Sequence, residues 1–394
     1  MSPGGIAFLS WKYLSYRPLR TLTLVAAVAL TIYLPLALQV FISESTRVLR
    51  ERARSTPLLV GPKGSSIDLT LNSLYFTPQE LPSLNYAAFL KLSGQHFGSA
   101  IPLHVRFRAG NAPIIGTSLD YFRQRELDVA EGRMITRLGD CVVGARLAAE
   151  KKLKPGDKIT SSPENVFDLA GVYPLRMRVT GVLAPNHSAD DNAVFVDLKT
   201  AWVIEGLAHG HQDLVKPEAA GAIRKREGDL IQANASVVEF NEVTEANLDS
   251  FHFHGDPATY PLSSAILVPD SDKARALALG EYQGESATEQ IVIPLEAVTA
   301  LTETLFATRR LVLAAFLLLG AAALGLAALV FLLSFRLRER EMRTYVKIGA
   351  TDFTIRILKF TEVAIVLVAG IVLSLGAVVV TRSLAADLLP KLLN

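Results

Sequence analysis

The stretch LVLAAFLLLGAAALGLAALVFLLSF, residues 311–335, runs for 25 residues without a charged side chain. Two other stretches share this property: TLTLVAAVALTIYLPLALQVFIS at residues 21–43 and VAIVLVAGIVLSLGAVVVT at residues 363–381. A bilayer core about 30 Å thick needs about 20 apolar helical residues to cross it. Buried helices of soluble proteins rarely run charge-free for so long. The sequence therefore predicts three transmembrane helices, at residues 21–43, 311–335 and 359–381.

A cleaved signal peptide is the alternative for the first apolar stretch. Such a peptide has an apolar core of about 7–15 residues followed by a small-residue cleavage site. The stretch here is longer, and Phe41-Ile42-Ser43-Glu44-Ser45 is a poor cleavage signal. We therefore interpret residues 21–43 as a retained membrane anchor.

Basic residues near the apolar stretches set the expected orientation, because Lys and Arg are enriched on the cytoplasmic side. Lys12, Arg17 and Arg20 precede the first stretch without an acid. Seven basic residues lie between the second and third stretches: Arg336, Arg338, Arg340, Arg343, Lys347, Arg356 and Lys359. Residues 1–20, which contain an expected interfacial helix, and residues 336–358 are thus predicted to be cytoplasmic. Residues 44–310 and the tail at 382–394 are predicted to lie on the opposite side.

The large segment at 44–310 is predicted to be an α+β domain, because β-branched runs alternate with helical ones. Its start, 44–56, is expected to continue the first helix, and residues 286–310 to form a helix leading into the second span. The strand candidates are Ile67–Phe76, Ile101–Phe107, Ala112–Ser118, Asp140–Val143, Asp157–Thr160, Leu175–Leu183, Ala193–Val196, Ala233–Phe240 and Ser263–Val268. The helix candidates are Ala145–Lys151, Asp197–Glu205 and Asp270–Leu279.

Charge and cysteine content exclude some classes of function. The formal net charge is only +2, which gives no indication of a nucleic-acid partner. Cys141 is the only cysteine, so no disulfide can form within the chain. The long external segment must therefore be stabilised by its own core.

The segment RLREREMRTYVKIGAT, residues 336–351, carries alternating charges followed by apolar residues at helical spacing. Gly349 can end such a helix by adopting a positive φ. One interpretation is a charged loop that faces lipid headgroups. The other is a short helix that docks its apolar side into a groove on a cytoplasmic partner, with the charges at the rim.

Glu-Arg-Glu-Met at 339–342 and Lys-Ile-Gly-Ala at 347–350 frame this segment, and Glu362 stands near the start of the next helix. This arrangement resembles the segment between the second and third spans of permeases of the FtsX/MacB type. The sequence WKYLSYRPLRTL at 11–22 also resembles the entry of that family into its first span.

Three motifs of the external segment follow the order seen in the MacB-like periplasmic core domain. They are Val-Val-Gly-Ala-Arg-Leu-Ala at 142–148, Leu-Lys-Pro-Gly-Asp-Lys-Ile at 153–159 and Val-Thr-Gly-Val-Leu at 179–183. Each motif alone is weak, but their joint order is specific for the family.

The resemblance implies a non-enzymatic membrane subunit that dimerises in the bacterial inner membrane and pairs with ATP-binding-cassette ATPase subunits. The ATPase subunit would bind ATP, and this chain would hold no cofactor. The coupling residues implied are Glu339, Arg340, Glu341, Met342, Tyr345, Lys347, Gly349 and Glu362. The external domain would transmit mechanical work to a molecule or partner in the periplasm.

The family usually has four spans, and this sequence contains three. The residues after Thr381 are too few to cross a membrane. We expect either that the fourth helix is missing from this chain or that the chain has been shortened.

A nucleotide site in this chain would need a phosphate-binding loop. Gly61-Pro62-Lys63-Gly64-Ser65-Ser66 is the nearest candidate, but it lacks the Gly-x-x-x-x-Gly-Lys-Ser/Thr order. We interpret it as an ordinary loop.

Two His-x-His pairs, His209/His211 and His252/His254, lie in the external segment. Residues i and i+2 of a strand face the same side, so both imidazoles of a pair can reach one metal ion. Asp213 and Asp256 follow closely in the sequence. The alternative is two exposed loops that happen to contain histidine, because the two pairs lie far apart in the chain. We leave the metal site open and assign no metal ligand.

The acidic pair Asp190-Asp191 lies in a Pro-Asn-His-Ser turn region and is interpreted as a solvated loop. Two hypotheses follow from the whole sequence: a transporter permease driven by a separate ATPase, and an FtsX-like regulator of a periplasmic partner. A metal-uptake component is a third, weaker hypothesis.

Overall fold

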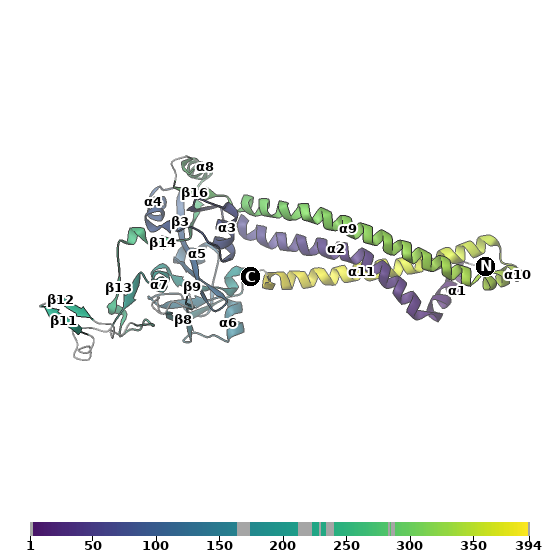
Figure 1. Ribbon diagram of the computed structural model, residues 1–394, viewed down its shortest axis with the longest axis horizontal. Coiled ribbons are helices and arrows are strands. Elements are labelled where there is room, and N and C mark those ends of the chain that lie inside the picture. The colour runs from purple at the N-terminus through teal and green to yellow at the C-terminus, as the bar shows by residue number, and fades with distance from the viewer. Residues whose placement is uncertain are drawn as a thin grey trace. The chain divides into compact units, whose positions relative to one another are not determined.

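A computed structural model describes residues 3–163, 174–211, 223–227, 230–233, 240–282, 284 and 288–392 (Figure 1). The chain divides into two compact units. The first comprises Met1–Val48 with Thr302–Leu389, and the second comprises Leu49–Leu301 with Pro390–Asn394.

The first unit is helical. Its helices are α1 (Pro3–Tyr16), α2 (Pro18–Arg54), α9 (Pro294–Leu337), α10 (Glu339–Lys347) and α11 (Asp352–Leu392), where α2 and α9 extend into the second unit. Among the described residues, three helical stretches are long and apolar enough to cross a membrane: Pro18–Arg54, Leu311–Leu337 and Asp352–Ala385. The prediction of a membrane protein with three transmembrane helices is confirmed, and α2 continues past residue 44 as expected.

Helices α2 and α11 approach closely at Gly370. A Cβ atom on Gly370 would lie 2.6 Å from the Cγ1 atom of Val28, so only glycine fits here without a shift. One turn further along α11, Ser374 is also buried. Small residues at this spacing let two membrane helices pack backbone to backbone.

The second unit is built on a mixed sheet. In the described part of the chain, ten strands pair in the order β16-β1-β15-β3-β4-β9-β6-β8-β5, with β7 also paired to β8. The strands are β1 (Leu58–Pro62), β3 (Gly98–Ala109), β4 (Ala112–Thr117), β5 (Val129–Gly132), β6 (Asp140–Val143), β7 (Lys158–Thr160), β8 (Arg176–Leu183), β9 (Val194–Asp197), β15 (Ser264–Pro269) and β16 (Glu289–Val292). Two-stranded pairs are formed by β2 (Leu84–Asn85) with β14 (Pro261–Leu262), β10 (Ala208–Gly210) with β13 (Phe251–Phe253), and β11 (Ile223–Glu227) with β12 (Leu230–Ala233).

Both faces of the large sheet are buried, which explains why its central strands are apolar runs instead of alternating ones. In β9, Phe195 packs in one core cluster while Val194 and Val196 pack in another. In β1, Leu59 and its neighbours likewise face opposite clusters. Helices cover the two faces: α3 (Ser66–Tyr75), α4 (Tyr86–Gly94), α5 (Leu119–Gln124), α6 (Ala145–Lys151), α7 (Leu198–Ile204) and α8 (Asp272–Glu281). The α+β class predicted for this segment is confirmed.

Two local predictions are wrong. Residues 67–76 were expected to form a strand, but they belong largely to helix α3. The Ser65 side chain accepts a hydrogen bond from the Asp68 backbone N–H, and this cap outweighs the β-branched residues that suggested a strand. Residues 289–292 were expected to be helical, but they pair with β1 as strand β16, and α9 begins only at Pro294.

The remaining elements lie close to the predicted ranges. Strand β6 and helix α6 have the predicted bounds, and the strands or helices expected at 101–107, 112–118, 157–160, 175–183, 193–205, 263–268 and 270–279 are present with shifted ends. The predicted strand Ala233–Phe240 falls mainly on residues 234–239, which lie outside the described residues.

The backbone at Gly144 leaves no room for a side chain. This residue precedes α6, and a Cβ atom there would lie 2.2 Å from the Asp190 carbonyl oxygen and 2.4 Å from the Asp191 carbonyl. Gly144→Ala is therefore expected to destabilise the second unit by about 1–3 kcal/mol through overpacking. The measurement is thermal unfolding followed by the fluorescence of buried Trp202 in a Trp11→Phe background, since these are the two tryptophans. Gly94→Ala is the control, because nothing lies within 4 Å of its Cβ position. Equal unfolding temperatures for the two variants would contradict the prediction.

Candidate coupling sites

Helix α10 occupies the segment that the sequence singles out as the cytoplasmic coupling element. Beyond its end, Gly349 has φ +100°, and the Ala350 N–H donates to the Tyr345 carbonyl at 2.9 Å. This is the hydrogen-bond pattern that closes a helix over a glycine in the left-handed region. The predicted role of Gly349 in ending the helix agrees with this geometry.

The apolar side of α10 is covered within the chain. Met342 is buried in a cluster with Ile6 of α1 and Leu358 of α11, and Tyr345 packs against the same cluster. Glu339, Arg340, Glu341, Lys347 and Gly349 are exposed. Two apolar side chains beside them also face outward, since Val346 is 45% and Ile348 78% exposed. The surface that α10 offers is thus a mixed charged and apolar one that excludes Met342.

Arg338 joins α10 to the rest of the first unit. Its Nη1 donates to both carboxylate oxygens of Glu362 on α11, at 2.8 and 3.0 Å, and its Nε donates to Glu341 at 2.9 Å. The guanidinium also lies 3.3 Å from the centroid of the Tyr13 ring on α1. Arg338 therefore connects three helices in one contact set.

Glu362 explains why this arginine is needed. Its side chain is almost fully buried near the start of an apolar helix, where an uncompensated carboxylate would be costly. The sequence drew attention to Glu362 but not to Arg338. The missing signal was available in principle, because a lone acid beside an apolar stretch requires a cation. Four arginines of this segment could supply the cation that pairs with Glu362: Arg336, Arg338, Arg340 and Arg343. Only the packing of α9 against α11 determines that it is Arg338.

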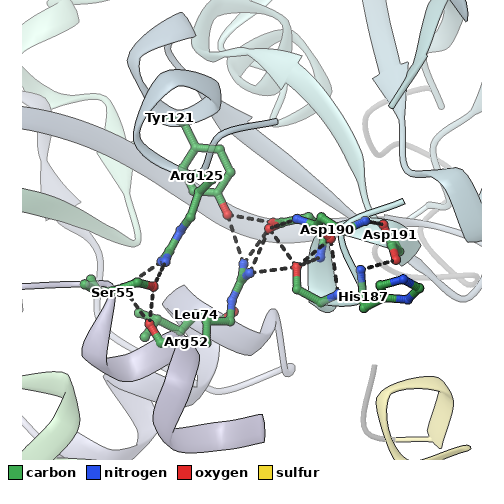
Figure 2. Close-up of polar contacts among 11 residues, drawn as sticks. Arg52, Ser55, Leu74, Tyr121, Arg125, His187, Asp190 and Asp191 are labelled. Atoms are coloured by element: carbon green, nitrogen blue, oxygen red, sulfur yellow. Dashed lines mark hydrogen bonds and ion pairs between the residues drawn. The ribbon is translucent and has the colours of Figure 1, made fainter. Parts of the chain in front are cut away.

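A second cluster of charges, which the sequence did not predict, lies inside the second unit (Figure 2). Arg52, near the end of α2, forms two hydrogen bonds with the Asp190 carboxylate, at 2.7 and 2.8 Å. Asp190 belongs to the short 3-10 helix η1 (Ala189–Asn192). Tyr121 of α5 donates from its hydroxyl to Asp190 at 2.7 Å. All three side chains are buried.

Every donor of the Arg52 guanidinium has a partner. Besides Asp190, its nitrogens donate to the Ser188 hydroxyl at 3.0 Å, to the Tyr121 hydroxyl at 3.0 Å and to the Leu74 carbonyl. The guanidinium also lies over the Phe76 ring at 5.3 Å. Five N–H donors in a fixed planar fork are thus satisfied, which is the condition under which a buried arginine is tolerated.

Arg125 lies at the edge of the same cluster. It donates to the hydroxyl groups of Ser55 and Thr56, at 2.8 and 2.7 Å, and lies over the Tyr121 ring at 5.8 Å. Ser55 and Thr56 directly follow the last residue of α2, so the end of this helix is held on two sides.

The electrostatics of the cluster follow from burial and from Arg52. Burial alone would raise the pKa of Asp190, but the charge and hydrogen bonds of Arg52 outweigh it and hold that pKa well below its usual range. Burial raises the pKa of Tyr121, and the Asp190 charge adds to this effect. Because the folded pKa of Asp190 is depressed, the pair stabilises the fold at neutral pH. That contribution is lost only as the pH falls below about 4, the ordinary range of an aspartate.

The interpretation of Asp190-Asp191 as a solvated loop is therefore wrong. Asp190 is buried in the ion pair, and Asp191 accepts hydrogen bonds from the backbone N–H groups of Asn186 and His187 at 3.0 and 2.9 Å. A turn-like sequence with two acids usually faces solvent. Here the partner that buries one of them comes from a position 138 residues away in the chain.

Comparison with known proteins agrees with this architecture. The family model described as the MacB-like periplasmic core domain matches residues 22–235, more than half of the chain. The chain therefore belongs to this family, whose members are membrane proteins of the ABC transporter permease type. No curated protein matches the chain.

Two solved structures are similar to parts of the chain. The periplasmic region of MacB from Actinobacillus actinomycetemcomitans is 12% identical, with a TM-score of 0.35, over 66% of this chain and 97% of that one. The extracellular domain of the noncanonic ABC-type transporter YknZ from Gram-positive bacteria is 13% identical, with a TM-score of 0.32, over 60% of this chain and 98% of that one.

The contribution of the Arg52–Asp190 pair to stability can be measured by substitution. Arg52→Met leaves the Asp190 carboxylate buried without its cation, so unfolding of the second unit is expected to become about 3–5 kcal/mol easier. The double variant Arg52→Met/Asp190→Asn removes both charges and is expected to recover part of that loss. Denaturant unfolding followed by Trp202 fluorescence in the Trp11→Phe background measures both.

Arg123→Met is the control for this experiment. Its guanidinium is paired with Asp120 at the surface, with 80% of the arginine side chain exposed, and the change is expected to be within about 1 kcal/mol. A loss for Arg52→Met as small as that for Arg123→Met would refute a structural role of the buried pair.

Proposed function

We propose that this chain is the membrane subunit of an ATP-binding-cassette complex in the bacterial inner membrane. A separate cytoplasmic ATPase subunit binds and hydrolyses ATP, two copies of this chain form the membrane part, and the second unit does mechanical work or exports a molecule on the periplasmic side. The observation that carries the proposal is the Arg338 contact set, which ties the exposed helix α10 to helices α1 and α11.

The exposed side of α10 provides a surface for the ATPase. Arg340 and Lys347 supply charges for the rim, and Val346 with Ile348 supply an apolar centre. Interfaces commonly combine an apolar centre with a polar rim. Met342 and Tyr345 support this surface from behind, since they pack against α1 and α11. The role proposed for them is to hold α10 in place, while Glu339, Arg340, Glu341, Lys347 and Gly349 lie at or beside the contact.

The buried contacts of Arg338 make α10 a rigid extension of the membrane helices. A force on α10 acts on Glu362 of α11 through the buried ion pair that Arg338 Nη1 forms with both of its carboxylate oxygens, and this pair would be costly to break. Displacement of α10 by ATP-driven closure of the ATPase would therefore move α11 with it, instead of bending a loop.

Near the C-terminal end of α2, the Arg52 cluster attaches this helix to the second unit. Helix α2 continues without interruption from Pro18 to Arg54, and Arg52 is fixed to α5 and η1 by buried hydrogen bonds. A displacement of α2 along or about its axis would thus act directly on the sheet that carries these elements.

An ATPase assay tests the docking surface. Arg340→Glu and Ile348→Asp, each in the full chain co-purified with its ATPase subunit, are expected to weaken the contact about tenfold, or about 1.4 kcal/mol, because both side chains are exposed on α10. The readouts are the amount of ATPase retained and the stimulation of its ATP hydrolysis by this chain.

Arg123→Glu is the matched charge reversal for this assay, because Arg123 is exposed on α5 of the second unit. It is expected to leave both readouts unchanged. If Arg340→Glu and Ile348→Asp retain full ATPase binding and stimulation while folded, α10 is not the docking element.

Cysteine labelling tests the orientation in the membrane. Cys141 is fully buried, and burial raises the pKa of its thiol, so it should not react with a membrane-impermeant maleimide. Leu277→Cys on exposed α8 is expected to be labelled from the periplasmic side only, and Ile348→Cys from the cytoplasmic side only. Spheroplasts and inside-out vesicles provide the two sides, and the opposite labelling pattern would overturn the orientation.

An FtsX-like regulatory role is the second candidate function. A groove of about 1100 Å³ in the second unit is lined by both polar and apolar residues, among them Asp68, His104, Arg106 and Leu262. Such a mixed lining suits a periplasmic protein segment. Recovery of one stoichiometric periplasmic partner that is lost on Arg106→Glu would favour regulation over export.

A further inference from the structure

The two His-x-His pairs meet on one small ribbon of the second unit. Strands β10 and β13 are antiparallel, and their register places His209 directly opposite His252, with Ala208 opposite Phe253 and Gly210 opposite Phe251. The pairing joins residues more than 40 positions apart in the chain, which the sequence alone did not fix.

Alternation along the two strands separates a core face from a histidine face. Ala208 and Gly210 are buried, and Phe251 and Phe253 pack against the neighbouring core clusters. Gly210 is required opposite Phe251, because a Cβ atom there would lie 2.6 Å from the phenyl ring. The apolar face therefore anchors the ribbon to the fold without help from the histidines.

The four imidazoles gather on the other face. The ring of His209 lies 4.9 Å from that of His252 and 4.7 Å from that of His254, and the latter two are 4.7 Å apart. His211 adds a fourth ring, 5.2 Å from His252. His252 and His254 are exposed and His209 and His211 half-buried, so these rings contribute little to the core.

The ring nitrogens are placed for a metal ion. One nitrogen from each of His209, His252 and His254 lies within 4.8 Å of the others. Tetrahedral coordination with Zn–N bonds of about 2.1 Å needs nitrogens about 3.4 Å apart. The difference is small enough to be closed by rotation about the side-chain torsions of His252 and His254, which are exposed.

One imidazole is already oriented for ligation. The Nδ1–H group of His252 donates to the Ser250 carbonyl oxygen at 3.0 Å. This hydrogen bond leaves the Nε2 lone pair available as a metal ligand, and it fixes the ring direction as such bonds do in known metal sites. Of the two acids named from the sequence, Asp256 instead caps the short helix η4 (Pro257–Thr259) through the Ala258 N–H. Asp213 lies outside the described residues.

We propose that His209, His252 and His254 bind one borderline transition-metal ion of the Zn²⁺ class, with His211 or a water molecule as the fourth ligand. An all-imidazole set suits Zn²⁺, Cu²⁺ or Ni²⁺ and disfavours Mg²⁺ and Ca²⁺, which prefer oxygen ligands. The site stands on the ribbon geometry alone and does not depend on the proposed ATPase coupling.

Zinc titration of the full chain tests the site. The protein is purified in detergent without a polyhistidine tag, stripped with a chelator and titrated with ZnCl₂ by isothermal calorimetry. We expect one Zn²⁺ per chain with a micromolar or tighter dissociation constant. With Co²⁺ as the probe, we expect the intense visible absorption of a tetrahedral ion.

Two variants decide whether the ribbon holds the metal. His252→Gln/His254→Gln removes two ligands from exposed positions and is expected to weaken Zn²⁺ binding at least tenfold and to abolish the Co²⁺ spectrum. His96→Asn is the control, because His96 is exposed outside the ribbon and asparagine tolerates its φ of 54°. Unchanged Trp202 fluorescence in the Trp11→Phe background verifies that both variants are folded. The proposal is overturned if the wild-type chain takes up no Zn²⁺, or if the double variant binds Zn²⁺ as tightly as the His96→Asn control.

Discussion

The second unit depends on the buried ion pair between the Arg52 guanidinium and the Asp190 carboxylate. Burying an arginine carries a large desolvation penalty. It is offset here because the guanidinium donates hydrogen bonds to an aspartate, a tyrosine, a serine and a backbone carbonyl at the same time. These partners come from α3, α5 and the turn before β9, so their relative positions are fixed by the shape of one planar group. A lysine could not replace it, because an ammonium offers only three donors and no fork geometry.

The first unit contains the same device in a different setting. Arg338 pairs with buried Glu362 through two hydrogen bonds and lies on the Tyr13 ring. In both units a helix end is held by an arginine that reaches into an otherwise apolar region. Apolar packing alone lets one helix slide along another. Arg52 bonds the Asp190 carboxylate through two nitrogens, a geometry that fixes one relative position, and Arg338 adds a charged contact to Glu362 through one nitrogen. Such contacts are what the mechanical role proposed above would require.

The sequence predicted the features that depend on local pattern. Charge-free runs predicted the membrane helices, and the short apolar runs at 140–143 and 193–196 predicted strands. Their central place in the sheet explains why these runs do not alternate. One prediction, the strand at 67–76, failed because the local Ser65 cap favours a helix. Others failed where a distant partner decides the outcome. Strand β16 exists because β1 offers an edge to residues 289–292, and nothing within those four residues opposes a helix. The candidate sites follow a similar division. Gly349 was predicted from local pattern and Glu362 from the family resemblance, while the roles of Arg338, Arg52 and Asp190 follow only from contacts across the fold.

The position of β1 in the sheet has a consequence for the order of events during synthesis. Strand β1, at residues 58–62, lies between β15 and β16, whose residues run from 264 to 292. At an elongation rate of about 5–20 residues per second, the ribosome needs roughly 10–45 seconds to make the intervening chain. Throughout this interval the apolar strand Leu58-Leu59-Val60 has neither of its neighbours, directly after a helix that enters the membrane. Strand β1 can therefore join the sheet only after residues 264–292 have been made, whereas β4, β5, β6, β8 and β9 find partners among themselves within residues 112–197.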